Sequence, residues 1–117
     1  MSPRAKAILD FWFVETPSEK RFKKDQEFDQ LIKNNFSKDY ERASKNEYDD
    51  WQDTPMETLA LIILFDQFSR NIFRDDKKAF EQDTKARLIV SDAVHAGFLE
   101  EMDQSQRLFI YHRVSGR

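Results

Sequence analysis

The sequence LALIILFDQFSRNIFR, residues 59–74, decides the fold class. Its first seven residues are all apolar, and no Gly or Pro interrupts the stretch. Immediately before it, TPME at residues 54–57 fits a capping box, in which Thr54 is the N-cap and Glu57 bonds back to the amide of Thr54. The pattern predicts a long, buried helix that starts at this cap and runs to about Arg74.

The composition favours helices throughout the chain. Only two Gly and three Pro occur in 117 residues, which argues against a fold with many tight turns. Charged residues make up 35% of the chain, so the core must consist of a few large side chains, mainly the 11 Phe, three Tyr and two Trp. One such core suffices for a chain of this length, and we expect a single helical domain over residues 1–117.

Apolar residues recur every three or four positions in four further segments. They predict helices that start after Ser2 and end near Val14, run from Asp25 to about Ala43, extend from about Phe80 to Gly97, and begin between Glu101 and Gln106. We therefore expect an all-α fold of about five helices in antiparallel pairs, with a tetratricopeptide-like or helical-bundle arrangement.

Several classes of function find no support in the sequence. The absence of Cys excludes disulfides and cysteine-based metal sites, and the chain has neither a Gly-rich phosphate loop nor a His-Glu-x-x-His motif. We expect no metal and no other cofactor. No apolar run is long enough to cross a membrane, and a net charge of −3 with interleaved acids and bases indicates no nucleic-acid partner. These features predict a cytoplasmic protein.

Polar residues interrupt the apolar helix in its second half. On a helical wheel with about 100° per residue, Asp66, Arg70 and Arg74 form a stripe opposite an apolar face, and Gln67 and Asn71 lie beside that stripe. Asp66 and Arg70 are four positions apart and therefore within reach of each other.

Three interpretations of this stripe stay open. The helix could leave the core there, so that the charged residues form an ordinary surface ladder. The side chains could instead be buried and purely structural, tying the helix to a neighbour, for example through Asp83. Alternatively they form the floor of a groove, in which Arg70 and Arg74 present planar donors to a carboxylate or phosphate. Trp12, between two Phe residues, could line a pocket or belong to the core.

Several segments are similar to a known family. They are LDFWF (9–13), RFKKDQEFD (21–29), DW (50–51), residues 59–74, AF (79–80) with Asp83 and Ala86, Gly97, and RLFIY (107–111). On these segments the sequence resembles the bacterial family known as domain of unknown function 924, a helical group near the tetratricopeptide-like superfamily. The resemblance implies an all-α fold of antiparallel helix pairs and no established activity. It also implies that the family's signature polar positions are Asp66, Gln67, Arg70, Asn71, Arg74 and Asp83.

The end of the chain differs from the pattern of that family. Members continue after the RLFIY-like segment with a Pro-containing stretch, a His-Ser-Glu-like triplet and further helices, whereas this chain reads HRVSGR at residues 112–117. We therefore interpret residues 112–117 as an atypical tail and residues 1–117 as the N-terminal part of a longer family domain. A face that further helices would cover favours a homo-oligomer.

The leading functional hypothesis is a binding or interaction module. Antiparallel helix pairs make concave surfaces, and Arg70 and Arg74, assisted by Gln67 and Asn71, would hold a small anionic ligand or the acidic group of a peptide or protein. The alternative is an enzyme that acts on a small anionic substrate, with Asp66 or Asp83 as the acid–base group; it requires a carboxylate with a shifted pKa in a closed pocket.

Overall fold

The computed structural model describes residues 1–21 and 23–114, and these residues form helices and turns with no β-strand among them. The α-helices are α1 (Pro3–Leu9), α2 (Gln26–Ser44), α3 (Pro55–Ile62), α4 (Ser69–Ile72), α5 (Asp83–His95) and α6 (Gln104–Phe109). Three π-helical segments continue them without a break: η1 (Asp10–Glu15) after α1, η4 (Ile63–Phe68) between α3 and α4, and η7 (Ile110–Val114) after α6. The described residues thus contain five continuous helices, which confirms the predicted all-α class.

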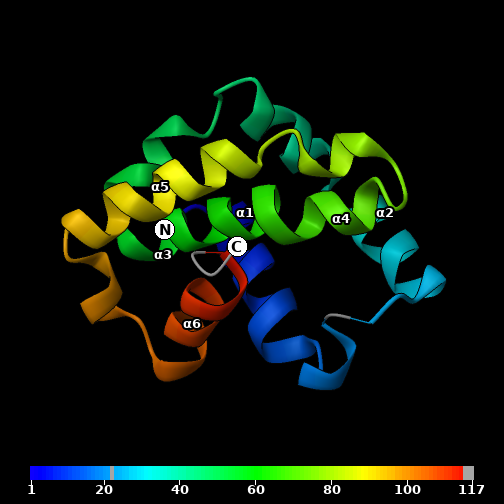
Figure 1. Ribbon diagram of the computed structural model, residues 1–117, viewed down its shortest axis with the longest axis horizontal. Helices are drawn as coiled ribbons and strands as arrows, with labels where there is room; N and C mark the ends of the chain where they lie inside the picture. Colours follow the sequence, from blue (N-terminus) through cyan, green and yellow to red (C-terminus); the bar gives the residue numbers. More distant parts are fainter. Residues whose placement is uncertain (22, 115–117) are drawn as a thin grey trace.

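The helix made of α3, η4 and α4 is the centre of the fold. It contacts α1, α2 and α5, and Figure 1 shows α5 running antiparallel beside it, with α6 on the other side. Every residue from position 58 to position 69 is buried. The stretch from residue 59 to residue 74 is therefore enclosed by other helices for most of its length.

Aromatic packing joins the first two helices to this centre. The Phe68 ring in η4 lies 4.9 Å from that of Phe36 in α2 and 5.9 Å from those of Phe11 and Trp12 in η1, measured between centroids. Each such ring contributes a large apolar area, so a few aromatics can form a core in a chain that is rich in charge. Trp12 is 1% exposed and belongs to this core.

Helix ends follow the local sequence signals closely. Asp25 caps α2 as expected, because its Oδ1 accepts hydrogen bonds from the amides of Glu27 and Phe28. Gly97 adopts the left-handed conformation after α5, with φ of 78°. The central helix stops at Ile72, two residues before the predicted end.

The capping box predicted at Thr54 is wrong in its bonding. Pro55 does start α3, but Thr54 Oγ1 donates to Glu57 Oε1 at 2.8 Å, and no side-chain cap is formed. The other carboxylate oxygen of Glu57 accepts from the backbone amide of Ser2 at 2.9 Å. Glu57 thus ties the start of α3 to the start of α1, a long-range contact that competes with the local box.

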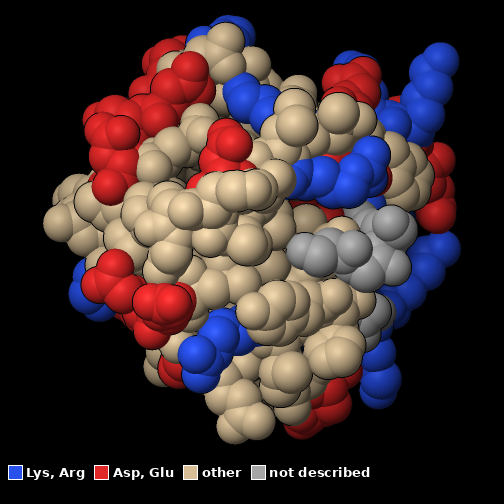
Figure 2. Space-filling view, turned by 60° about the vertical axis from the view of Figure 1, so that its left-hand side comes forward, with Lys and Arg blue, Asp and Glu red and all other residues tan. Residues whose placement is uncertain are grey.

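The surface carries charge and apolar area side by side. In Figure 2 uncharged residues cover the centre of one face, and charged residues gather nearer its edge. The exposed large apolar side chains include Leu88 and Val94 on α5 and Leu108 and Tyr111 on the last helix. Within the described ranges, no helix combines the length and hydrophobicity that crossing a membrane requires. Of the predicted tail, residues 112–114 belong to η7, and residues 115–117 lie outside the described part.

Replacing Asp25 tests the N-cap of α2. We expect Asp25→Ala to lower the free energy of unfolding by about 1 kcal/mol, because two amides of the first turn lose their acceptor. Asp25→Asn keeps a side-chain oxygen and should cost only a few tenths of that amount. Urea denaturation of both variants measures their free energies of unfolding. Equal stability of the alanine variant and the wild type would contradict the role of Asp25 as the N-cap of α2.

Glu57 gives the fold a specific acid sensitivity. Its pKa is lowered from the ordinary value of 4.5, first by the hydrogen bond from the Ser2 amide and then by that from Thr54. Because the folded-state pKa is the lower one, the carboxylate stabilises the fold above about pH 4.5, and this contribution disappears as the pH falls through the lowered pKa.

At pH 7 Glu57→Gln should therefore have a lower free energy of unfolding than the wild type. This difference in the free energy of unfolding should become smaller below about pH 4.5. Denaturation curves between pH 3 and pH 7 measure this. Glu19→Gln, at an exposed position without a described hydrogen bond, is the control. If the free energy of unfolding of Glu57→Gln differs from that of the wild type by the same amount at every pH, the carboxylate does not have this role.

Candidate functional site

The polar residues of the central helix lie in and just beyond its π-helical segment. Asp66 and Gln67 belong to η4, Arg70 and Asn71 to α4, and Arg74 follows the helix end. A π-helical turn contains an extra residue, so a wheel of about 100° per residue does not hold across η4.

Burial differs along this polar stretch. Asp66, Gln67 and Asn71 are buried, while the side chains of Arg70 and Arg74 are 16% and 30% exposed. The helix therefore stays in the core at Asp66, whereas the interpretation as a surface ladder requires it to leave the core there.

Arg70 is bound by Asp83, at the start of α5. Its Nη1 donates to Asp83 Oδ1 at 2.7 Å and its Nη2 to Asp83 Oδ2 at 3.0 Å, a bidentate ion pair. The same guanidinium lies 4.9 Å from the centroid of the Phe80 ring, and Nη1 also reaches the carbonyl oxygen of Ala79 at 3.4 Å. Arg70 Nη1 also donates to Ser69 Oγ at 3.3 Å within the central helix. The bidentate pair with Asp83 therefore ties this helix to α5.

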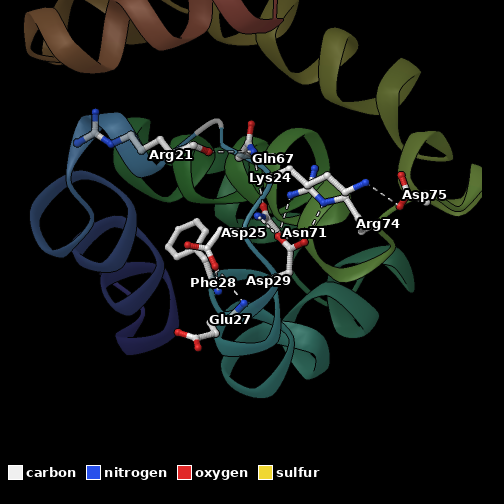
Figure 3. Close-up of polar contacts among 10 residues, drawn as sticks. All are labelled: Arg21, Lys24, Asp25, Glu27, Phe28, Asp29, Gln67, Asn71, Arg74 and Asp75. Atoms are coloured by element: carbon white, nitrogen blue, oxygen red, sulfur yellow. Dashed lines mark hydrogen bonds and ion pairs between the residues drawn. The ribbon is translucent and has the colours of Figure 1, made fainter.

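Arg74 is bound in the same way by a carboxylate that the sequence analysis did not single out. Its Nε and Nη2 donate to the two oxygens of Asp29 in α2, at 2.8 and 2.7 Å (Figure 3). Asn71 Nδ2 donates to Asp29 Oδ1 at 2.9 Å. The hydrogen bonds that Arg74 donates to Asp29 raise the pKa of this guanidinium above its ordinary value. Asp29, Asn71 and Arg74 therefore form one network between α2 and the central helix.

Gln67 extends this network toward the loop before α2. Its Nε2 lies 3.5 Å from Asn71 Oδ1 and 3.5 Å from the backbone carbonyl oxygen of Arg21 (Figure 3). Gln67, Asn71 and Arg74 thus point to one side of the central helix, and Arg70 points to the other, toward α5. Asp66 is 1% exposed within η4. Trp12 lies in the aromatic core and lines a different hollow.

Asp29 could have been found from the sequence. Ile32, Phe36 and Tyr40, the residues that define the apolar face of α2, all lie within about 60° of Asp29 on a helical wheel. An acid at the centre of an apolar face requires a partner, because burying an unpaired carboxylate is costly. That face carries a second such residue, Asp39, which binds Arg4 of α1 at 2.6 Å.

A hollow opens beside Arg74, which we call the Arg74 hollow. Its volume is about 580 Å³, and it is lined by Lys24, Gln26, Asp29, Gln30, Lys33, Asn71, Ile72, Arg74 and Asp75. A second hollow of about 370 Å³ is lined by Arg70, Arg74, Asp75, Asp76, Lys77, Ala79 and Phe80. Arg74 thus lines both hollows, and the two arginines share the smaller one. Nowhere in residues 1–21 and 23–114 are three His, Asp or Glu side chains grouped to hold a metal ion.

The fold and this network define a small all-α protein with partly buried Asp–Arg ion pairs between its helices. The sequence from residue 8 to residue 115 matches the family described as "Bacterial protein of unknown function (DUF924)". The chain therefore belongs to this family, which confirms the resemblance found in the sequence. The family description assigns no activity.

A solved structure has the same fold. The protein of unknown function ATU0120 from Agrobacterium tumefaciens superimposes with a TM-score of 0.86 at 33% sequence identity. The match covers 92% of this chain and 61% of that protein, so the chain spans less than two thirds of that protein's length. No curated protein matches the sequence.

Truncating Arg70 measures how much the fold depends on its bond to Asp83. We expect Arg70→Ala to lower the free energy of unfolding by about 3 kcal/mol, because Asp83 is then left mostly buried without its bidentate partner. Lys45→Ala is the control: the side chains of its ion pair with Glu41 are 63% and 65% exposed, so its loss should be much smaller than that of Arg70→Ala. Equal losses for the two variants in urea denaturation would show that Arg70 does not brace the fold.

Proposed function

We propose that this protein is a binding module that holds an anionic group, a carboxylate of a small ligand or of an acidic peptide, in the Arg74 hollow. The observation that carries the proposal is a guanidinium that is already oriented and charged at the edge of an open, polar hollow. A hollow of about 580 Å³ is within the size range of small-molecule sites.

Arg74 supports the proposal through the donors that it keeps. A guanidinium has five N–H donors, and Asp29 engages the edge formed by Nε and Nη2. Nη1 lies on the side away from Asp29 (Figure 3), and the described residues offer it no hydrogen bond. Because Asp29 fixes the plane of the guanidinium, a ligand does not have to order that side chain when it binds.

Charge around the hollow also favours an anion. Its lining contains three cations, Lys24, Lys33 and Arg74, against two carboxylates, Asp29 and Asp75. Lys24 pairs with Asp75 at 3.2 Å, whereas Lys33 is exposed and has no ion pair among the described residues. Lys33 is therefore a cation that a ligand carboxylate can pair with at no cost to an existing contact.

Arg70 has a different role from the one that the sequence suggested for it. Both of its Nη atoms are engaged by Asp83, so we assign it to bracing the helix behind the site. Asp66 and Asp83 do not line the Arg74 hollow, and no observation favours the alternative of an enzyme with one of them as the acid–base group.

Reversing the charge of Lys33 tests the proposal without stranding a partner. Calorimetric titration with succinate and with an acetylated tetraglutamate peptide would show binding to the wild type that weakens with added salt. In Lys33→Glu the affinity should fall about tenfold, since a carboxylate then faces the ligand. Lys38→Glu, on the same helix but outside the hollow, should bind like the wild type.

Two results would contradict the proposal. One is the absence of binding by the wild type at millimolar concentrations of both probes. The other is a loss of affinity in Lys77→Glu but not in Lys33→Glu, since Lys77 lines only the smaller hollow and that result would place the ligand there.

A further inference from the structure

A separate hollow lies between the first and the last helix, and we call it the Arg21 hollow. It is lined by Trp12, Phe13, Leu108 and Phe109 and by the polar side chains of Arg21, Gln104, Ser105 and His112, with a volume of about 520 Å³. In Figure 1 the segment that follows α1, in blue, runs beside α6, in red, at this place. The hollow shares no residue with the Arg74 hollow.

The walls of this hollow are aromatic. The Phe109 ring is 6.2 Å from both the Trp12 and the Phe13 ring, measured between centroids, and the three rings come from η1 and α6. Leu108 is 43% exposed, so an apolar side chain lies near solvent beside these rings. Walls of this kind favour a flat apolar ligand, because aromatic rings pack well edge to face and in offset stacks.

Arg21 places an oriented cation against these walls. Its Nε donates to the carbonyl oxygen of Trp12 at 2.9 Å and its Nη2 to that of Phe13 at 3.1 Å, at the end of the first helix. The guanidinium carbon also lies 5.5 Å from the centroid of the Phe13 ring. Two of five N–H donors are thereby used, so Nη1 and the second N–H of Nη2 form an edge that can bind a carboxylate.

The charge of Arg21 is not matched by an acid in the hollow. No Asp or Glu is present among the described residues that line it. Arg74 and Arg70, by contrast, are each held by a carboxylate on both oxygens. An incoming anion in the Arg21 hollow therefore meets a cation without having to compete with an internal carboxylate.

We propose that the Arg21 hollow binds a small aromatic monocarboxylate. The ring of the ligand packs against Trp12, Phe13 and Phe109, and its carboxylate accepts from the free edge of Arg21. This site is independent of the function proposed for the Arg74 hollow, since the two have no residue in common.

Phenylacetate is a suitable probe, and phenylacetamide is its uncharged counterpart. Titration of the full chain, followed by the indole N–H resonances, should shift the signal of Trp12 and leave that of Trp51, which lines neither hollow. Phenylacetate should bind at least about tenfold more tightly than phenylacetamide. Equal affinity of the two, or no shift of Trp12 with 10 mM phenylacetate, would overturn the proposal.

A charge placed at Leu108 tests the location without disturbing the core. Leu108→Glu puts a carboxylate at the hollow and should weaken phenylacetate binding about tenfold. Leu88→Glu is the matched control, because Leu88 is also exposed but lies on α5 outside the hollow. If both variants bind phenylacetate like the wild type, the proposed site is wrong.

Arg21→Gln tests the anchor itself. It should reduce the preference for phenylacetate over phenylacetamide to within about twofold, because the amide side chain offers no charge. An unchanged preference in the folded variant would overturn the role of Arg21.

Should this variant not fold, because Arg21 also binds two carbonyls at the end of η1, the comparison of Leu108→Glu with Leu88→Glu decides. Succinate binding that is lost in Lys33→Glu but kept in Leu108→Glu belongs to the Arg74 hollow and leaves this proposal unaffected.

Discussion

The enclosure of most of the central helix is the constraint on which the rest of the structure depends. Residues 58–69 are all buried, yet this helix carries an acid, two amides and two arginines in and just beyond its second half. Buried polar groups must find hydrogen-bond partners within the protein, since water cannot reach them. The neighbouring helices supply these partners, Asp29 from α2 and Asp83 from α5. The polar residues that seem out of place on an apolar helix thereby fix how two other helices dock on it.

The elements of the fold were predictable because their signals are local. Apolar periodicity, an N-cap at Asp25 and a left-handed Gly97 each depend on a few neighbouring residues, and the structure confirms them. The capping box at Thr54 failed for a reason that no local pattern contains. Glu57 finds the amide of Ser2, which lies 55 positions away in sequence.

The candidate site was predictable only in part. The sequence singled out the arginines and amides of the central helix, and it named Asp83 as a possible partner of that helix. It missed the π-helical segment, because a wheel with a fixed angle per residue cannot show an extra residue in a turn. It also missed the bond between Asp29 and Arg74, which are 45 positions apart. The position of Asp29 on the apolar face of α2 was the available signal.

Three arginines of this chain differ in how much of their hydrogen bonding is made within the fold. Arg70 is bound bidentately by a carboxylate, is 16% exposed and also contacts the Phe80 ring, so nearly all of its bonding serves the fold. Arg74 is bound in the same way but is more exposed and keeps Nη1 beside an open hollow.

Among the described residues, the Arg21 guanidinium donates its hydrogen bonds to neutral carbonyl groups, so its charge is oriented without an ion pair. The free energy that an anion gains from a guanidinium depends on what it must displace, and that cost decreases from Arg70 to Arg74 to Arg21. In this chain Arg70 and Arg74 both tie the central helix to a neighbouring helix, and the least compensated of the three guanidinium groups is that of Arg21.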